Sequence, residues 1–276
     1  MPTVNYASKY SSVIDEAFKL ASVTEARLNQ TYDFIGVKTI KIYSRNTAEM
    51  QDYTISGTNR YGTPDELGNN EQELTLSKDR SFTFTLDRLA VESTMGTYEA
   101  GAALRSQIDQ VVIPEVDLYR LNKYVSAATE NGATDNTVPT SENAYELFLK
   151  AQEYLGDKKV PLTERVLYCT YAFYNLIKLD KAFVRNGDRS QEMLITGQIG
   201  TVDGVPVVPV PASYLEGANF VVTHKSVMLS PYKLQDYKIH DNPPGINGYL
   251  VEGRIVYDAF ILNKKKDAIF ANTKAA

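Results

Sequence analysis

QELTLSKDRSFTFTLDR, residues 72–88, is the stretch of sequence that decides the expected fold. Leucine and phenylalanine occupy even positions from 74 to 86, interrupted by Lys78 and Arg80, while odd positions from 75 to 85 are polar. This period of two predicts a β-strand. At about 3.3 Å per residue the strand would extend roughly 55 Å, whereas a compact chain of this length has a radius of gyration of about 19 Å. We therefore expect it to project from the body of the protein.

Segments upstream supply the return of this strand. VKTIKIYS, residues 37–44, and DYTIS, residues 52–56, predict further strands, and Gly, Asn and Pro punctuate residues 57–70 as in a turn. Together they predict a projecting β-hairpin arm with one apolar face. Because an isolated two-stranded ribbon is at best marginally stable in water, the arm needs a partner surface, most simply another copy of this chain.

The composition is that of an ordinary globular protein. The 276 residues are 43% hydrophobic and 23% charged, which is enough for one large core or two modest ones. A formal net charge of -5 and a pI near 5.3 argue against a protein that wraps nucleic acid. The single Cys169 excludes an intrachain disulfide and favours a reducing cytoplasm. Neither a signal sequence nor an apolar run of membrane-spanning length is present, so we expect no membrane partner.

A long helix is expected after the arm. Residues 93–128 carry apolar side chains at three- and four-residue spacings, which predicts an amphipathic helix. Pro114 removes a backbone donor, so a kink or break is expected near Ile113. We assign the neighbouring Glu115 and Asp117 a structural role at the start of the second half of the helix.

The remaining sequence divides into three parts. Residues 8–30 predict an N-terminal arm with a short helix. Beyond a polar loop at 129–143, the chain alternates between helical and extended patterns up to residue 229. The last part, 232–262, alternates around a Pro-Pro-Gly turn and predicts a closing antiparallel pair.

This order of parts resembles the major capsid protein fold of tailed bacteriophages, the Hong Kong 97-like fold. The segments that carry the likeness are RYGTPDELG and QELTLSKDRSFTFTLDR in the extended loop, VIPEVDLYRL in the helix, and VTHKSVMLSPYKLQDYKIHDNPPGINGYLVEGRIVYDAFIL near the end. The resemblance implies an α+β fold of five parts: an N-terminal arm (1–36), an extended β-hairpin loop (37–90), a peripheral domain with a long spine helix (91–140), an inserted axial α/β domain (141–229) and a return β-ribbon of the peripheral domain (230–276).

The same resemblance implies a structural protein and no enzyme. It predicts self-assembly into the icosahedral head shell of a phage, as pentamers and hexamers that enclose double-stranded DNA, with no cofactor. Further expected partners are a separate scaffolding protein, a portal, and packaged DNA contacted weakly and without sequence preference. The expected location is the virion capsid, assembled in the cytoplasm of a bacterial host. An encapsulin-like nanocompartment shell is the alternative within this fold.

The candidate functional residues lie on the predicted arm and form an interface between subunits. Apolar residues would cover a neighbour, and charged residues would set the register of the contact by pairing across it. The candidates are Arg60, Tyr61, Leu74, Leu76, Lys78, Asp79, Arg80, Phe82, Phe84, Asp87 and Arg88. The extended loop that the resemblance implies covers the same residues.

A soluble α/β enzyme is the alternative from another functional class. Cys169 with His224 or His240 would supply its nucleophile and base, but Cys169 lies in an apolar run that is typical of a buried small side chain. The two histidines lack clustered ligands at metal-binding spacing, and no nucleotide-binding loop is present.

Two lysine features remain open. The run 264–266 is either a solvated loop or a contact to packaged DNA. Lys78 has the residue type for an isopeptide crosslink to Asn242 or Asn247 of a neighbouring subunit, as the resemblance allows.

Overall fold

The structure is a computed structural model that describes residues 22–29, 39–93, 99–180 and 200–274. Most of the expected N-terminal arm, 1–36, lies outside these residues. The described helices and strands, in chain order, are η1 Glu25–Arg27, β1 Thr39–Arg45, β2 Asn69–Thr75, β3 Lys78–Asp87, α1 Arg88–Ser93, α2 Ala100–Gln107, η2 Ile108–Val112, α3 Ile113–Glu130, β4 Thr134–Asp135, α4 Ala144–Asp157, β5 Arg165–Thr170, α5 Tyr171–Leu179, β6 Thr201–Val202, β7 Val205–Val210, η3 Ala212–Tyr214, β8 Ala218–His224, β9 Met228–Leu229, β10 Tyr232–Asp241, β11 Gly248–Tyr257, β12 Phe260–Ile261, η4 Asn263–Ala268 and β13 Ile269–Thr273.

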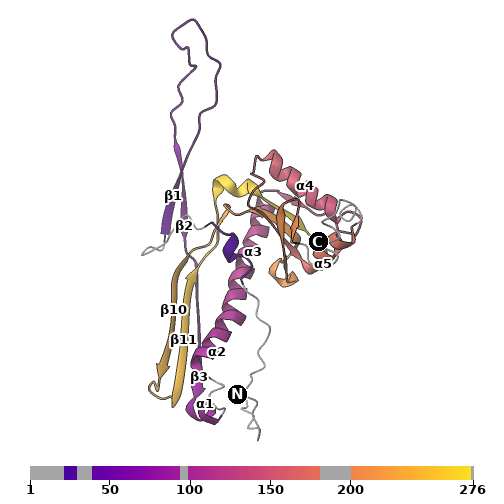
Figure 1. Cartoon of the computed structure of the whole chain (residues 1–276). Coiled ribbons are helices and arrows are strands. Elements are labelled where there is room, and N and C mark those ends of the chain that lie inside the picture. The colour runs from indigo at the N-terminus through magenta and orange to yellow at the C-terminus, as the bar shows by residue number, and fades with distance from the viewer. Residues whose placement is uncertain (1–21, 30–38, 94–98, 181–199, 275–276) are drawn as a thin grey trace.

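A narrow arm extends far from the rest of the molecule (Figure 1). Its base is the antiparallel pair β1 and β2, in register from Thr39 opposite Thr75 to Arg45 opposite Asn69. Residues 46–68 form the distal loop, which is closed at its start by a hydrogen bond from Asn46 N–H to the carbonyl of Gly68. The expected strand at 52–56 is wrong, because these residues form no strand and Ile55 and Ser56 lie in a bend.

The expectation of one continuous strand from 72 to 88 is also wrong. The strand breaks at Leu76 and Ser77, and its two halves join different sheets: β2 pairs with β1, and β3 pairs with β11. A side chain takes the place of the ladder partner at the break, because the Asp258 carboxylate accepts the Ser77 N–H at 2.8 Å. Only the first half of the stretch therefore belongs to the projecting arm.

The second half lies in a three-stranded antiparallel sheet of order β10-β11-β3. Strands β10 and β11 form the expected closing pair, and β3 lies along the other side of β11 with Lys78 opposite Tyr257 and Asp87 opposite Gly248. The face that carries Val251, Ile255 and Tyr257 is buried. Ile255 and Tyr257 form a small core there with Val116 of α3.

One continuous helical stretch, 100–130, runs from the lower end of the molecule to the six-stranded sheet (Figure 1). Its turn just before Pro114 is wider than an α-helical turn: η2 is π-helical, and Ile113 N–H bonds the carbonyl of Ile108. The expected irregularity near Ile113 is thus present as a change of helix type. Pro114 follows this turn directly and lacks the N–H that would bond a carbonyl of the preceding turn, so the helical bonding changes at this point.

The main core surrounds a six-stranded mixed sheet of order β4-β13-β8-β5-β7-β6. On one face Phe173 of α5 lies 4.4 Å from Phe220 of β8, and α4 covers the same face. On the other face Tyr168 of β5 stacks on Tyr124 of α3. Every residue of β5 is buried, which agrees with the apolar run from which a buried strand is expected. Two of the six strands, β4 and β13, come from outside 141–229.

Candidate assembly interface

The distal loop of the arm is the least covered part of the described chain. Every residue from 46 to 68 is exposed except Gly62, which is half-buried. Large apolar side chains are among them: Met50 is 99%, Ile55 87%, Tyr61 87% and Leu67 68% exposed. Apolar side chains clustered on one protruding element mark a surface that another molecule covers.

Local contacts give the loop a defined shape without giving it a core. Thr54 N–H donates to the carbonyl of Arg60, and the Gln51 side chain bonds the backbone of Thr63 in both directions, accepting from its N–H at 2.8 Å and donating to its carbonyl. Tyr53 and Tyr61 meet edge to face at 5.1 Å. The loop is therefore a shaped binding element, and its apolar surface remains available.

The charge of the distal loop is acidic. Residues 46–68 contain Glu49, Asp52, Asp65 and Glu66 against the single cation Arg60. The guanidinium of Arg60 donates to the carbonyl of Gly57 at 3.2 Å. Acidic groups around an apolar surface favour a partner that combines apolar contact with positive charge.

The base of the arm is fixed to the body by apolar packing. Leu74 and Leu76 are 3% and 1% exposed and form a small core with Leu229. Gln72 adds polar contacts at the same place, because its side-chain amide donates to the carbonyl of Ile261 and accepts from the N–H of Asn263. These two leucines, expected to cover a neighbour, instead attach the arm to its own chain.

The predicted interface charges of β3 have partners within the chain. The Arg254 guanidinium forms a bidentate pair with the Asp79 carboxylate at 2.9 and 2.6 Å, and Arg80 pairs with Glu115 of α3 at 2.7 Å. Both pairs are exposed, so each contributes little to stability. A role in contacts between subunits stays a prediction for Asp79 and Arg80.

The other candidates in β3 and α1 also contact their own chain. The Phe82 ring lies 6.2 Å from Phe84 and 6.1 Å from Tyr237. Asp87 accepts a hydrogen bond from the backbone of α1, and the Arg88 N–H bonds the loop before β11. Of the predicted set, Arg60 and Tyr61 therefore remain on the uncovered loop.

Sequence reasoning missed most apolar residues of the loop. Ile55 was expected in a return strand and Leu67 in a turn, and Met50 lay between the two expected strands without an assigned role. The sequence feature that could have identified them is an apolar side chain within a stretch rich in turn-forming residues. Such a stretch has no helical or strand periodicity that would direct the side chain toward a core.

A buried cation attaches the segment before the arm to the long helix. Arg120 is fully buried and donates to the hydroxyl of Thr24 at 3.0 Å and to the carboxylate of Glu25 at 2.7 Å, while its ring contact is Tyr232. Asp117 accepts from the backbone and hydroxyls of residues 22–24. Asp117 thus has a structural role that differs from the expected one at the helix start.

The Cys169 thiol does not have the surroundings of a nucleophile. Cys169 is fully buried in β5, and burial raises its pKa to about 12. His224 lies opposite Arg165 on the neighbouring strand. Arg165 is four residues from Cys169 along β5, which places His224 roughly 13 Å from the thiol. His240 lies in the three-stranded sheet beside Glu252. The described residues therefore do not bring the proposed dyad together.

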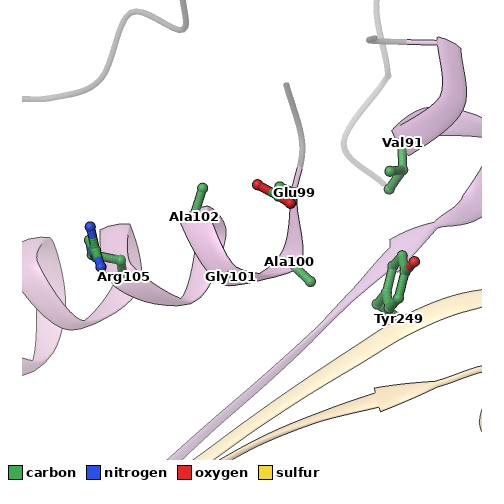
Figure 2. A pocket seen from close by; sticks show the side chains of 7 residues that line it. All are labelled: Val91, Glu99, Ala100, Gly101, Ala102, Arg105 and Tyr249. Atoms are coloured by element: carbon green, nitrogen blue, oxygen red, sulfur yellow. The ribbon is translucent and has the colours of Figure 1, made fainter. Parts of the chain in front are cut away.

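The other surface features of the described residues hold no evident chemistry. The cavity in Figure 2 lies between α1, the start of α2 and Tyr249 of β11. Ala100 faces Tyr249, while Glu99, just before α2, and Arg105, on α2, lie apart. No group of three potential metal ligands occurs in the described ranges. Among those ranges, no helix is long and apolar enough to cross a membrane.

The lysine features contact the chain itself. Lys264 and Lys265 donate to the carbonyls of Arg45 and Ser226, so two of the three lysines in the run hold the base of the arm and a nearby turn. Lys78 lies 5.0 Å above the ring of Tyr119. DNA contact by the lysine run and a crosslink through Lys78 stay predictions.

Comparison with known proteins finds the fold among phage structures. No protein family model and no curated protein matches the sequence. A structure from Mycobacterium phage Che8 matches with a TM-score of 0.72 at 15% identity, over 98% of both chains. The asymmetric unit of the bacteriophage PhiM1 mature capsid matches with a TM-score of 0.72 at 14% identity, over 98% of this chain and 92% of the other.

The capsid structure of cyanophage P-SCSP1u matches equally well, with a TM-score of 0.73 at 13% identity over 98% of this chain and 93% of the other. At identities this low, the TM-scores of these matches establish a common fold. The likeness extends over nearly the whole chain. The resemblance noted in the sequence is thus confirmed for the fold: this chain has the mixed α+β fold of tailed-phage capsid proteins.

Proposed function

We propose that this chain is the major capsid protein of a tailed bacteriophage, a structural subunit that assembles with copies of itself into an icosahedral shell. The observation that carries the proposal is the uncovered apolar loop of the arm on a fold shared with phage capsids. An arm that its own molecule does not cover makes a contact between different surfaces of two copies, and such contacts close into rings.

The finer features follow from the same proposal. Rings of five and six subunits tile the shell, with residues 141–229 toward the ring axes and the long helix in the peripheral part. Each subunit touches several neighbours, so modest contacts sum to a stable particle. A separate scaffolding protein and a portal complete assembly in the bacterial cytoplasm. The shell, located in the virion, encloses double-stranded DNA, which it contacts weakly.

The alternatives have less support. An encapsulin-like nanocompartment would share the fold, but the matching structures named above come from phages. An enzyme that uses Cys169 lacks an accessible thiol. The shell protein therefore remains the preferred function.

Shortening the arm tests the proposal. In the variant, residues 47–67 are replaced by Asn-Gly, which leaves the β1 and β2 ladder in place up to Arg45 opposite Asn69. Wild-type chain is expected to form closed particles in negative-stain electron microscopy, whereas the variant sediments as folded, unassembled subunits. Normal shells from the shortened chain would contradict the role of the arm, and a wild-type chain that never assembles would contradict the proposed function.

A matched pair of variants separates apolar contact from loop shape. The first replaces Met50, Ile55, Tyr61 and Leu67 with serine, and the second replaces the four arm threonines 47, 54, 58 and 63 with serine. Only the first is expected to abolish particles, because it removes the apolar surface and keeps the length of the loop. Equal loss in both would mean that loop conformation, and not apolar contact, drives assembly.

A further inference from the structure

The second strand of the arm, β2, is followed by a break in the chain where it meets the body of the protein. At Leu76 and Ser77 the strand leaves the two-stranded ribbon and enters the three-stranded sheet, where Lys78 pairs with Tyr257. Asp258 follows Tyr257 directly, at the end of β11. The carboxylate of Asp258 thus lies where the direction of the arm is decided.

Both oxygens of this carboxylate are occupied. Oδ2 accepts from the N–H of Ser77 at 2.8 Å and from its hydroxyl at 2.7 Å. Oδ1 accepts from the hydroxyl of Tyr119 at 2.7 Å and from the N–H of Ala259 at 2.7 Å. Asp258 is only 3% exposed. One buried group therefore links Ser77, the second residue after β2, to the long helix and to the end of β11.

These bonds do something that the neighbouring apolar packing cannot do. Leu74 and Leu76 attach the base of the arm, but hydrophobic contact is non-directional and tolerates sliding. Hydrogen bonds weaken steeply when their geometry departs from linear. An ionised carboxylate also offers acceptors on both oxygens, which the amide of asparagine does not. The leucines and the two hydrogen bonds of Gln72 hold the base of the arm, and the carboxylate fixes the angle of the chain at the break.

We infer that Asp258 is a positioning residue that sets the direction of the arm relative to α3, so that the apolar loop reaches the correct place on a neighbouring copy. The inference rests on the proposed shell function. Without the carboxylate the chain still folds, but the arm swings about Leu76 and Ser77. Assembly then yields few closed shells and more open or irregular particles.

Distance measurements on the unassembled chain test the inference directly. Spin labels are placed on Thr58→Cys in the loop and Glu142→Cys on the body, both at exposed positions. Native Cys169 is fully buried and stays unlabelled while the protein is folded. The variants are Asp258→Asn and Ser77→Ala, and Ser81→Ala serves as the matched control, since Ser81 is an exposed serine four residues along the same segment.

The expected result is a narrow distance distribution in wild type and Ser81→Ala, and a broad one in Asp258→Asn and Ser77→Ala. The ratio of fixed to released arm falls about tenfold, as for the loss of one hydrogen bond to a charged group. The variants that broaden the distance distribution are also expected to give a lower yield of closed shells. Tyr119→Phe releases only the bond to the helix and is expected to give an intermediate width.

The outcomes separate the inference from the proposed function. An unchanged distribution in Ser77→Ala and Asp258→Asn overturns the inference even if shells form. If Asp258→Asn does not fold, Ser77→Ala decides, because Ser77 is exposed and its N–H remains. A broadened distribution in a chain whose wild type never forms shells supports the fixed arm and contradicts the shell function. A broadened distance distribution together with a normal yield of shells overturns the inference that the angle of the arm matters for assembly.

Discussion

The arm and the six-stranded sheet show two opposite solutions to apolar burial within one chain. In the sheet, every residue of β5 is buried between α3 on one face and α4 and α5 on the other. In the distal loop, 46–68, every residue but one is exposed, and four large apolar side chains lie more than two-thirds uncovered. The sheet has its core within the molecule, whereas the loop lacks one.

The difference teaches where the stability of each region comes from. Apolar side chains stabilise a fold in proportion to the area that they remove from water. Those of the sheet do so in the lone subunit, and those of the loop do so only when another copy covers them. Substitutions should therefore affect folding in the first region and assembly in the second.

The largest expected effect contrasts Phe220→Ala with Ile55→Ala. Phe220 is fully buried against Phe173, and its truncation is expected to lower the free energy of unfolding by about 3–5 kcal/mol. Ile55 is 87% exposed, so its truncation changes that free energy by less than about 0.5 kcal/mol in unassembled subunits. Urea denaturation of both variants, read beside particle yield, measures the contrast.

The contrast between the sheet and the loop would be wrong if Phe220→Ala and Ile55→Ala changed the free energy of unfolding equally. A loss of stability in unassembled Ile55→Ala comparable with that of Phe220→Ala would mean that the loop folds back on its own chain. Full particle yield from Ile55→Ala would show that this side chain lies outside the contact between copies.

The sheet could be predicted from the sequence because its signals are local. The apolar run at 165–179 predicts a buried strand followed by a helix, and the structure has β5 and α5 there. Helical spacing predicts the long helix, and Pro114 marks the point where its geometry changes. Each of these features depends on residues close together in the sequence.

The break at Leu76 and Ser77 could not be predicted in this way. The even positions stay apolar up to Leu76 and become apolar again at Phe82, and this interruption alone does not place a break. The group that ends the ladder, Asp258, lies 181 residues away. For the same reason the partners of Asp79 and Arg80, on β11 and α3, were invisible. Residues with a regular pattern were therefore assigned to the arm although the body holds them.

A smaller effect is expected in the body of the protein, in the middle of the three-stranded sheet. A Cβ added at Gly253 would lie 2.3 Å from Cζ of Phe82 and 2.9 Å from Cδ1 of Tyr237. Gly253→Ala is expected to cost about 1 kcal/mol, because these half-buried rings can move partly aside. The matched control is Gly101→Ala in α2, where a Cβ meets nothing within 4 Å and the helix gains about 0.5–1 kcal/mol. Thermal unfolding of the two variants should shift in opposite directions, and a stabilised Gly253→Ala would show that the aromatic pair is loosely packed.

The smallest effect is expected from reversing charges in the pair of Asp79 and Arg254. These variants test whether β3 contributes to contacts between copies, as the arm does, or only to the body of its own chain. Both side chains are half exposed, so reversing either charge alone should lower the unfolding midpoint only slightly. The double reversal, Asp79→Arg with Arg254→Asp, restores the pair within one chain. If the pair acts only there, the double variant regains both midpoint and particle yield. If Asp79 also meets a neighbouring copy, the midpoint recovers while the yield of shells stays low, because the partner charge on the neighbour now faces the wrong sign.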